Sequence, residues 1–121
     1  MMPQKDEHVN WATHNRGFWT SIDLDNTPFA DWAVTGMFYE SLHWVETFLS
    51  TKGHQYRKHY QREQAMRLLY PSDLGAIEAD YTKLKQDSET GRYECYRHTA
   101  EEARQLIPLV DRIKDHISQL V

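Results

Sequence analysis

The segment from 99 to 121 carries the pattern that most constrains how this chain can fold. Apolar residues recur there at steps of three and four, at Ala103, Leu106, Val110, Ile113, Ile117 and Leu120. This spacing places them on one face of a helix. Thr99 and Glu102 have the spacing of a capping box, in which each side chain satisfies a free backbone N–H at the helix start. The segment therefore predicts a capped helix, with a local bend at Pro108.

The rest of the sequence also favours helices. Apolar and polar residues alternate nowhere for long, and valine and isoleucine are sparse, which disfavours strands. We expect an all-α protein in a single domain, 1–121, because this length is typical of one domain. The further helices are expected at about 5–21, 28–52, 57–69 and 73–88.

Local residues set the expected helix ends. Thr27 is a suitable N-cap and Pro28 suits the first position of the second helix, which should stop at Gly53. Pro71 should end the third helix, and Gly91 should break the fourth.

The expected helix at 28–52 is apolar over more than one face, which is typical of a central helix or one that contacts a second subunit. Polar residues are expected to keep one of its sides in water: Glu40, His43 and Glu46. Three tryptophans, Trp11, Trp19 and Trp32, are expected to leave apolar surface exposed, which favours a homodimer.

Charge and cysteine content narrow the functional classes. The net charge of −4 argues against a general nucleic-acid coat, although it permits a local basic patch. The single cysteine excludes an intramolecular disulfide and suits a reducing, cytoplasmic environment. The polar start and the absence of an 18-residue apolar window predict neither a signal peptide nor a membrane span.

Three stretches resemble one protein family. They are the aromatic-rich "WAVTGMFYESLHWVETFLSTKG", the basic "YRKHYQREQAM" with its His59-x-x-Arg62 element, and "YTKLKQDSETGRY", which precedes the capped last helix. Over about 28–120 the chain resembles the HEPN domain family. The resemblance implies a four- to five-helix up-and-down bundle, HEPN-like and usually dimeric, with this region as its core. Family members include metal-independent ribonucleases, often toxins, and non-catalytic partners of nucleotidyltransferases.

The family's ribonucleases carry an arginine followed, four to six residues later, by a histidine. Arg92 and His98 match this spacing, and would stabilise the phosphorane charge and move a proton. Aligned on the family, however, Ser88 stands where the catalytic arginine would be and Tyr93 stands near the histidine, which favours loss of the motif. The competing interpretation is a loop in which the arginines pair with Asp87, Glu89 and Glu94.

The segment at 52–67 is strongly basic, and Glu63 is its one acidic residue. Its basic residues are Lys52, His54, Arg57, Lys58, His59, Arg62 and Arg67. One interpretation is a site for RNA or nucleotide phosphate, to which Arg97 would add, with Tyr56, Tyr60 and Tyr93 stacking on bases. The other is a solvated face, or a dock for the acidic residues Asp73, Glu78 and Asp80.

Metal binding and cysteine chemistry have little support in the sequence. Cys95 and His98, with Glu94 nearby, supply too few ligands for structural zinc, so we expect no metal and no cofactor. The overall expectation is a non-catalytic or degenerate RNA- or nucleotide-binding dimeric module. The alternatives are a toxin-type ribonuclease that uses Arg92 and His98, and a partner of a nucleotidyltransferase in a toxin–antitoxin pair.

Overall fold

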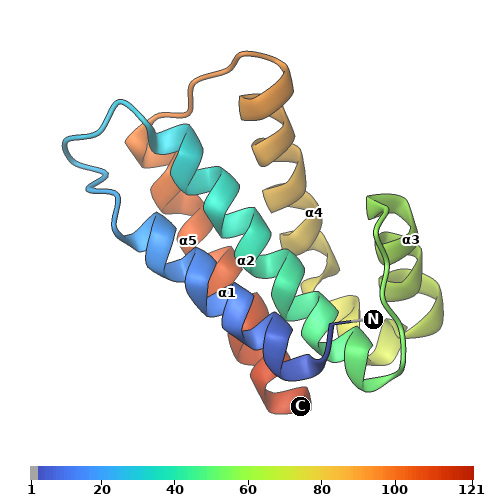
Figure 1. Ribbon diagram of the computed structural model, residues 1–121. Helices are drawn as coiled ribbons and strands as arrows, with labels where there is room; N and C mark the ends of the chain where they lie inside the picture. The colour runs from blue at the N-terminus through green and yellow to red at the C-terminus, as the bar shows by residue number, and fades with distance from the viewer. Residues whose placement is uncertain (1–2) are drawn as a thin grey trace.

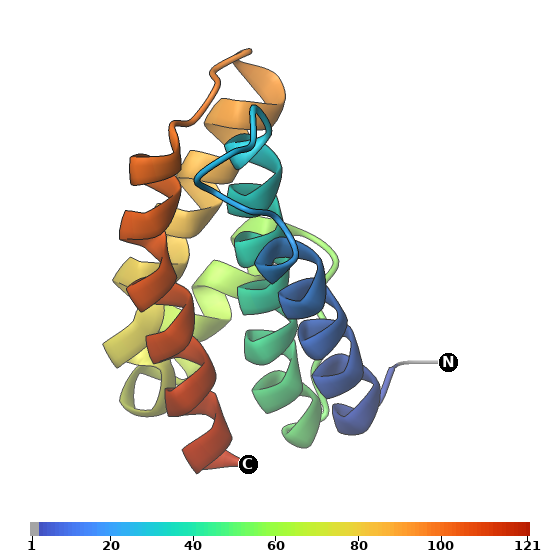
Figure 2. The same ribbon diagram turned by 90° about the vertical axis from the view of Figure 1, so that its left-hand side faces the viewer.

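The computed structural model describes residues 3–121, which form four long helices, one short helix and a π-helical turn. The elements are α1 (Lys5–Thr20), α2 (Ala30–Thr51), α3 (His59–Gln64), the π-helical turn η1 (Ala65–Leu69), α4 (Pro71–Tyr93) and α5 (Ala100–Leu120). No strand occurs within 3–121, so the all-α prediction is confirmed. The long helices α1, α2, α4 and α5 alternate in direction, and α3 with η1 projects beside the end of α2 (Figures 1 and 2).

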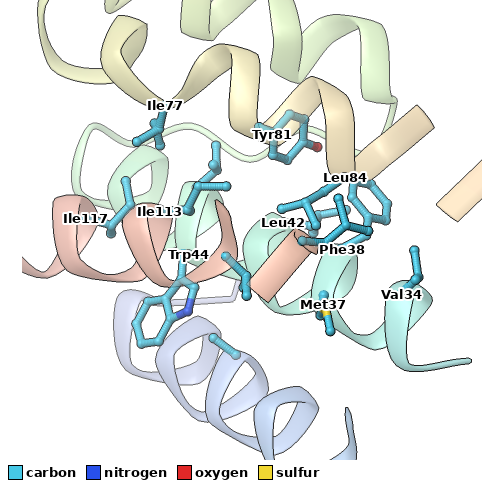
Figure 3. Close-up of a cluster of buried hydrophobic side chains, with 14 of the residues drawn as sticks. Val34, Met37, Phe38, Leu42, Trp44, Ile77, Tyr81, Leu84, Ile113 and Ile117 are labelled. Carbon is cyan, nitrogen blue, oxygen red and sulfur yellow. The ribbon is translucent and has the colours of Figure 1, made fainter. Parts of the chain in front are cut away.

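Helix α2 is the central element, in contact with α1 on one side and with α4 and α5 on the other. Its wide apolar arc allows this, because different stripes of the helix face different neighbours. Figure 3 shows the core where α2 meets α4 and α5, with Phe38 and Leu42 beside Tyr81 and Leu84, and with Ile113 close by. These side chains are almost completely buried.

Helix α5 is the element that the sequence predicted best. The Thr99 hydroxyl accepts a hydrogen bond from the Glu102 N–H at 3.1 Å, and the Glu102 carboxylate accepts one from the Thr99 N–H at 2.9 Å, so the capping box is confirmed. The apolar seam is buried from Ala103 to Ile117, whereas Leu120 is 37% exposed at the helix end.

Three predicted details of the helix ends are wrong. The Thr27 hydroxyl accepts a hydrogen bond from the Phe29 N–H at 2.9 Å, which forms a turn, and Phe29 takes the N-cap position of α2. Helix α4 starts at Pro71 and continues through Gly91 to Tyr93.

Gly91 has a packing role in place of the expected helix-breaking one. A Cβ atom at this position would lie 3.3 Å from Cδ2 of His98. The glycine therefore lets the loop at 94–99 return closely over the last turns of α4.

The side of α2 that was expected to face water is mostly buried, which corrects that prediction. Glu40 is completely buried, and its carboxylate accepts hydrogen bonds from Nε1 of Trp19 at 2.7 Å, from Nε1 of Trp44 at 2.8 Å and from Nε of Arg16 at 2.9 Å. Glu46 is 2% exposed and His43 is half-buried. The cause is the packing of two other helices: α1 supplies the partners of Glu40, and α3 supplies Arg62 to Glu46.

None of the helices in residues 3–121 is both long enough and apolar enough to cross a membrane.

Candidate functional site

A polar cleft of about 380 Å³ lies where α1, the middle of α2, the segment 54–58 and α3 meet. It is lined by His8, Tyr39, Leu42, His43, Glu46, Gln55, Tyr56, Arg57, His59 and Arg62. The volume is within the range of small-ligand sites. Titratable groups with shifted pKa values in a cleft are typical of functional sites, and three of these histidines have such shifts.

A buried ion pair forms one wall of the cleft. Arg62 is 3% exposed, and its Nε donates to Oε1 of Glu46 at 2.6 Å. Its Nη2 donates to the backbone carbonyl of Tyr56, and its Nη1 to Nδ1 of His59 at 3.3 Å. Burial alone would lower the pKa of Arg62, but the Glu46 carboxylate contributes to raising it above its ordinary value. Arg62 therefore stays charged and ties the segment 54–58 to the bundle.

The pKa values of the three cleft histidines are all lowered, which favours their uncharged forms at neutral pH. Nδ1 of His8 lies 3.1 Å from Nδ1 of His43, so one of these atoms donates a hydrogen bond to the other. Burial lowers the pKa of His8, and burial together with the neighbouring His8 and Arg62 lowers the pKa of His43 to about 4. Burial and the Arg62 charge also lower the pKa of His59.

Two buried polar atoms of cleft residues have no hydrogen-bond partner within residues 3–121. They are Oε2 of Glu46 and Nε2 of His8. Both side chains are more than nine-tenths buried. Buried polar groups are nearly always hydrogen-bonded, so two unpaired atoms in one cleft indicate a place where a bound molecule can supply the partners.

Acidification is expected to destabilise the fold through this cleft. An unfolded histidine takes up a proton near pH 6.5, whereas the pKa of folded His43 is about 4. Between these values the unfolded state binds more protons, so the free energy of unfolding falls as the pH falls from about 6.5 to 4, and the contribution is fully retained above 6.5. After allowance for the partial exposure of His43, the loss is about 1–2 kcal/mol.

Urea unfolding of wild type and His43→Gln across this pH range measures the effect. The variant should lose less stability on acidification than the wild type does. Parallel pH profiles for the two proteins would contradict a role for His43.

Arg92 does not line the cleft, and it is held by aromatic and hydroxyl groups. Its Nη1 donates to the hydroxyl of Tyr39 at 2.8 Å, and its Nε donates to the hydroxyl of Ser88 at 3.1 Å. Its guanidinium carbon lies 4.8 Å from the ring centre of Tyr93, which is itself largely exposed. Arg92 therefore connects α4 with α2, and Tyr39 separates it from the cleft interior.

His98 has a different set of partners from Arg92. It is 7% exposed, and its Nε2–H donates to the backbone carbonyl of Asp87 at 2.7 Å. Within residues 3–121 no hydrogen bond or ion pair joins Arg92 to His98. The expected pairing of the loop arginines with nearby acids is wrong for Asp87 and Glu89, which lie instead beside Lys83 and Lys85.

The basic segment divides into a cleft half and an outer half. Tyr56, Arg57, His59 and Arg62 line the cleft, and the ring of His54 stacks on Tyr56 with centres 5.7 Å apart.

On the outer half, Lys58 lies over the ring of Tyr60, and Arg67 approaches Glu78 at 3.8 Å. This last pair matches one contact of the expected acidic dock. Arg97 is exposed in the loop at 94–99 and does not line the cleft.

The sequence interpretation missed the α1 and α2 side of the cleft. His8, Tyr39, His43 and Glu46 were not expected to form a site with the basic segment. One signal was available: His43 and Glu46 are three residues apart, as are His59 and Arg62, so each pair lies on one helix face.

No three His, Cys, Asp or Glu side chains in the described part of the chain are arranged to hold a metal ion. No family model, curated protein or solved structure matches this chain.

Proposed function

We propose that this chain is a non-catalytic, HEPN-like module that binds RNA or a nucleotide in the polar cleft. The observation that carries the proposal is the composition of the cleft. An exposed cation, Arg57, lies at its edge, an aromatic ring, Tyr56, lies on its wall, and uncharged imidazoles lie inside. Arg57 can attract a phosphate group, a base can stack on the ring of Tyr56, and the imidazoles can form hydrogen bonds with the edge of a base.

The contacts of Arg92 and His98 support the non-catalytic form of the proposal. Acid–base cleavage of RNA needs both groups within reach of one phosphodiester. Arg92 is bound to Tyr39 and Ser88, and His98 is buried against the carbonyl of Asp87. Each side chain thus has a structural task that a joint catalytic site would interrupt.

Arg57→Ala is expected to weaken the binding of short single-stranded RNA several-fold. It should also reduce the salt dependence of the affinity by about one unit of log–log slope, because one phosphate contact is lost. Fluorescence anisotropy across a salt series measures both quantities. RNA incubated with the wild type and a chelator should stay intact.

Arg67→Ala is the matched control, since it removes the same charge from a residue that lies beside Glu78. Equal weakening in the two variants would mean that net charge alone attracts RNA. Cleavage that disappears in His98→Ala would establish the ribonuclease alternative.

A second copy of the chain is the proposed occupant of a separate, apolar groove. The groove has a volume of about 690 Å³ at the junction of α1 and α2, and Phe18, Phe29 and Trp32 line it with 45%, 58% and 53% of their surface exposed. At 150–250 Å² for each aromatic side chain, these three expose about 300 Å² per protomer. A two-fold contact would bury about 600 Å², which suits the apolar centre of a standard interface of about 1,600 Å².

Replacement of both Phe29 and Trp32 by serine is expected to convert a dimer into a monomer. Aromatic side chains that are hot spots at the centre of an interface carry about 2 kcal/mol each, so loss of both should raise the dissociation constant about a thousandfold. Sedimentation analysis over a concentration series measures it. Trp11→Ser is the control, because Trp11 is 56% exposed on α1 but does not line the groove. A monomeric wild type, or equal effects of the two changes, would contradict the assignment.

A further inference from the structure

Trp11 is an exposed aromatic side chain that lies beside the polar cleft. The centre of its ring is 6.1 Å from that of His43, and the two rings are stacked with 23° between their planes. His43 lines the cleft, and so does His8, which precedes Trp11 by one helical turn and therefore shares its side of α1. Trp11 thus continues the α1 wall beyond the cleft, with 56% of its surface exposed.

The indole ring of Trp11 is held in place by its neighbours. The ring of His14 meets it edge-on, with centres 5.2 Å apart and 83° between the planes. Toward α2 the indole stacks on His43, whose Nδ1 is in turn fixed by Nδ1 of His8 at 3.1 Å. A large ring that is already held in one orientation loses little conformational entropy when a ligand stacks on it.

The aromatic and cationic groups assigned to a nucleotide lie on another wall of the cleft. In the proposed function Arg57 attracts the phosphate and Tyr56 stacks on one base, and both come from the segment 54–58. Trp11 is not part of the cleft lining, so a base inside the cleft leaves its exposed surface uncovered. Proteins that bind single strands stack successive bases on aromatic side chains along one groove. A strand that leaves the cleft over α1 would place its next base on Trp11.

We propose that Trp11 stacks on the base next to the one held in the cleft, so that the ligand is single-stranded RNA of two or more nucleotides. This assignment rests on the proposed function and selects an RNA strand over a free nucleotide. It implies no choice of base, because every base has a face that can stack.

Matched adenine ligands separate the effect of a second base from that of a second phosphate. They are AMP, diadenylate with a 5′ phosphate, and two analogues of that dinucleotide in which the base at one end or the other is replaced by hydrogen. Both analogues keep the two phosphates. In calorimetric titrations the wild type should bind the dinucleotide about tenfold more tightly than AMP or either analogue, the ratio expected for one stacked base.

Trp11→Ala tests the residue assigned to this stacking. The variant should bind the dinucleotide about tenfold more weakly than the wild type and bind AMP equally well, which also shows that it is folded. Trp11→Phe keeps an aromatic ring and should retain part of the dinucleotide advantage. Tyr93→Ala is the control, because Tyr93 is 71% exposed but does not line the cleft, and its affinity for the dinucleotide should be unchanged.

The outcomes separate this inference from the function on which it rests. Arg57-dependent binding of AMP and the dinucleotide with equal affinity would overturn the role of Trp11 and leave a nucleotide-binding cleft. A dinucleotide advantage that persists in Trp11→Ala, or that Tyr93→Ala abolishes equally, would overturn it as well. Absence of binding to every ligand would overturn both proposals. An advantage lost in Trp11→Ala and kept in Tyr93→Ala supports the extended site.

Discussion

Glu40→Leu is expected to lower the free energy of unfolding by about 3–5 kcal/mol, a large part of the stability of a domain of this size. Leucine nearly fills the space of the glutamate, so the loss comes from hydrogen bonds and charge. Nε1 of Trp19 and Nε1 of Trp44 would lose their acceptor inside the bundle, and the guanidinium of Arg16 would lose its buried carboxylate. Unpaired buried donors and charges cost more than the original bonds contributed.

Asp111→Ala provides the matched comparison for this change. Asp111 is the other carboxylate bound to Arg16, at 2.8 Å, but about half of its side chain is exposed. Exposed ion pairs contribute little, so its removal should cost about 1 kcal/mol or less. Urea unfolding of both variants measures the difference. Similar losses of unfolding free energy in the two variants would mean that Glu40 contributes no more than a surface charge, which would contradict the role assigned to its burial.

Arg62→Met is expected to cost about 3–5 kcal/mol, because it leaves the buried charge of Glu46 without its partner. It also frees the backbone carbonyl of Tyr56 from the guanidinium. The expected result is a lower midpoint in urea and, under native conditions, a looser segment at 54–58.

A double replacement distinguishes the loss of the ion pair from the cost of leaving one buried charge unpaired. Arg62→Met combined with Glu46→Leu removes both charges, and exchanging a buried ion pair for apolar side chains is often neutral in stability. The double variant should therefore recover most of the loss. Arg67→Met, at an arginine whose side chain is 56% exposed, should change the unfolding free energy by about 0.5 kcal/mol or less. A double variant less stable than Arg62→Met alone would contradict this account of the pair.

The sequence predicted those parts of the fold that depend on neighbouring residues. The seam and capping box of α5 were predictable because their spacing and their partners lie within a few residues of one another. The continuation of α4 past Gly91 was not, because that glycine makes room for a loop residue, His98.

The buried charges could not be predicted for a related reason. Glu40 looks like a surface residue until α1 brings Arg16 and Trp19 to it, from 24 and 21 positions away. Arg62 was counted as part of a basic surface, yet Glu46, 16 positions away, draws it into the interior. Only the tertiary arrangement of the helices brings these partners together.

The candidate site was predicted in part for the same reason. Half of it, from Gln55 to Arg62, lies in the basic segment that the composition indicated. The other half comes from α1 and α2, and two of its residues, His43 and Glu46, were assigned to a hydrated side of α2. The RNA- or nucleotide-binding role is a proposal, which the comparison of Arg57→Ala with Arg67→Ala tests.

Two arginines have different roles at the segment 54–58. Arg62 holds the wall from inside, whereas Arg57, on the wall itself, points its charge to solvent at the edge of the cleft. The scaffold of the site and its outer recognition group are thus carried by separate residues. Under the proposed function, substitutions at position 57 would change what the cleft attracts without disturbing the bundle, so selectivity could evolve while the fold stays constant.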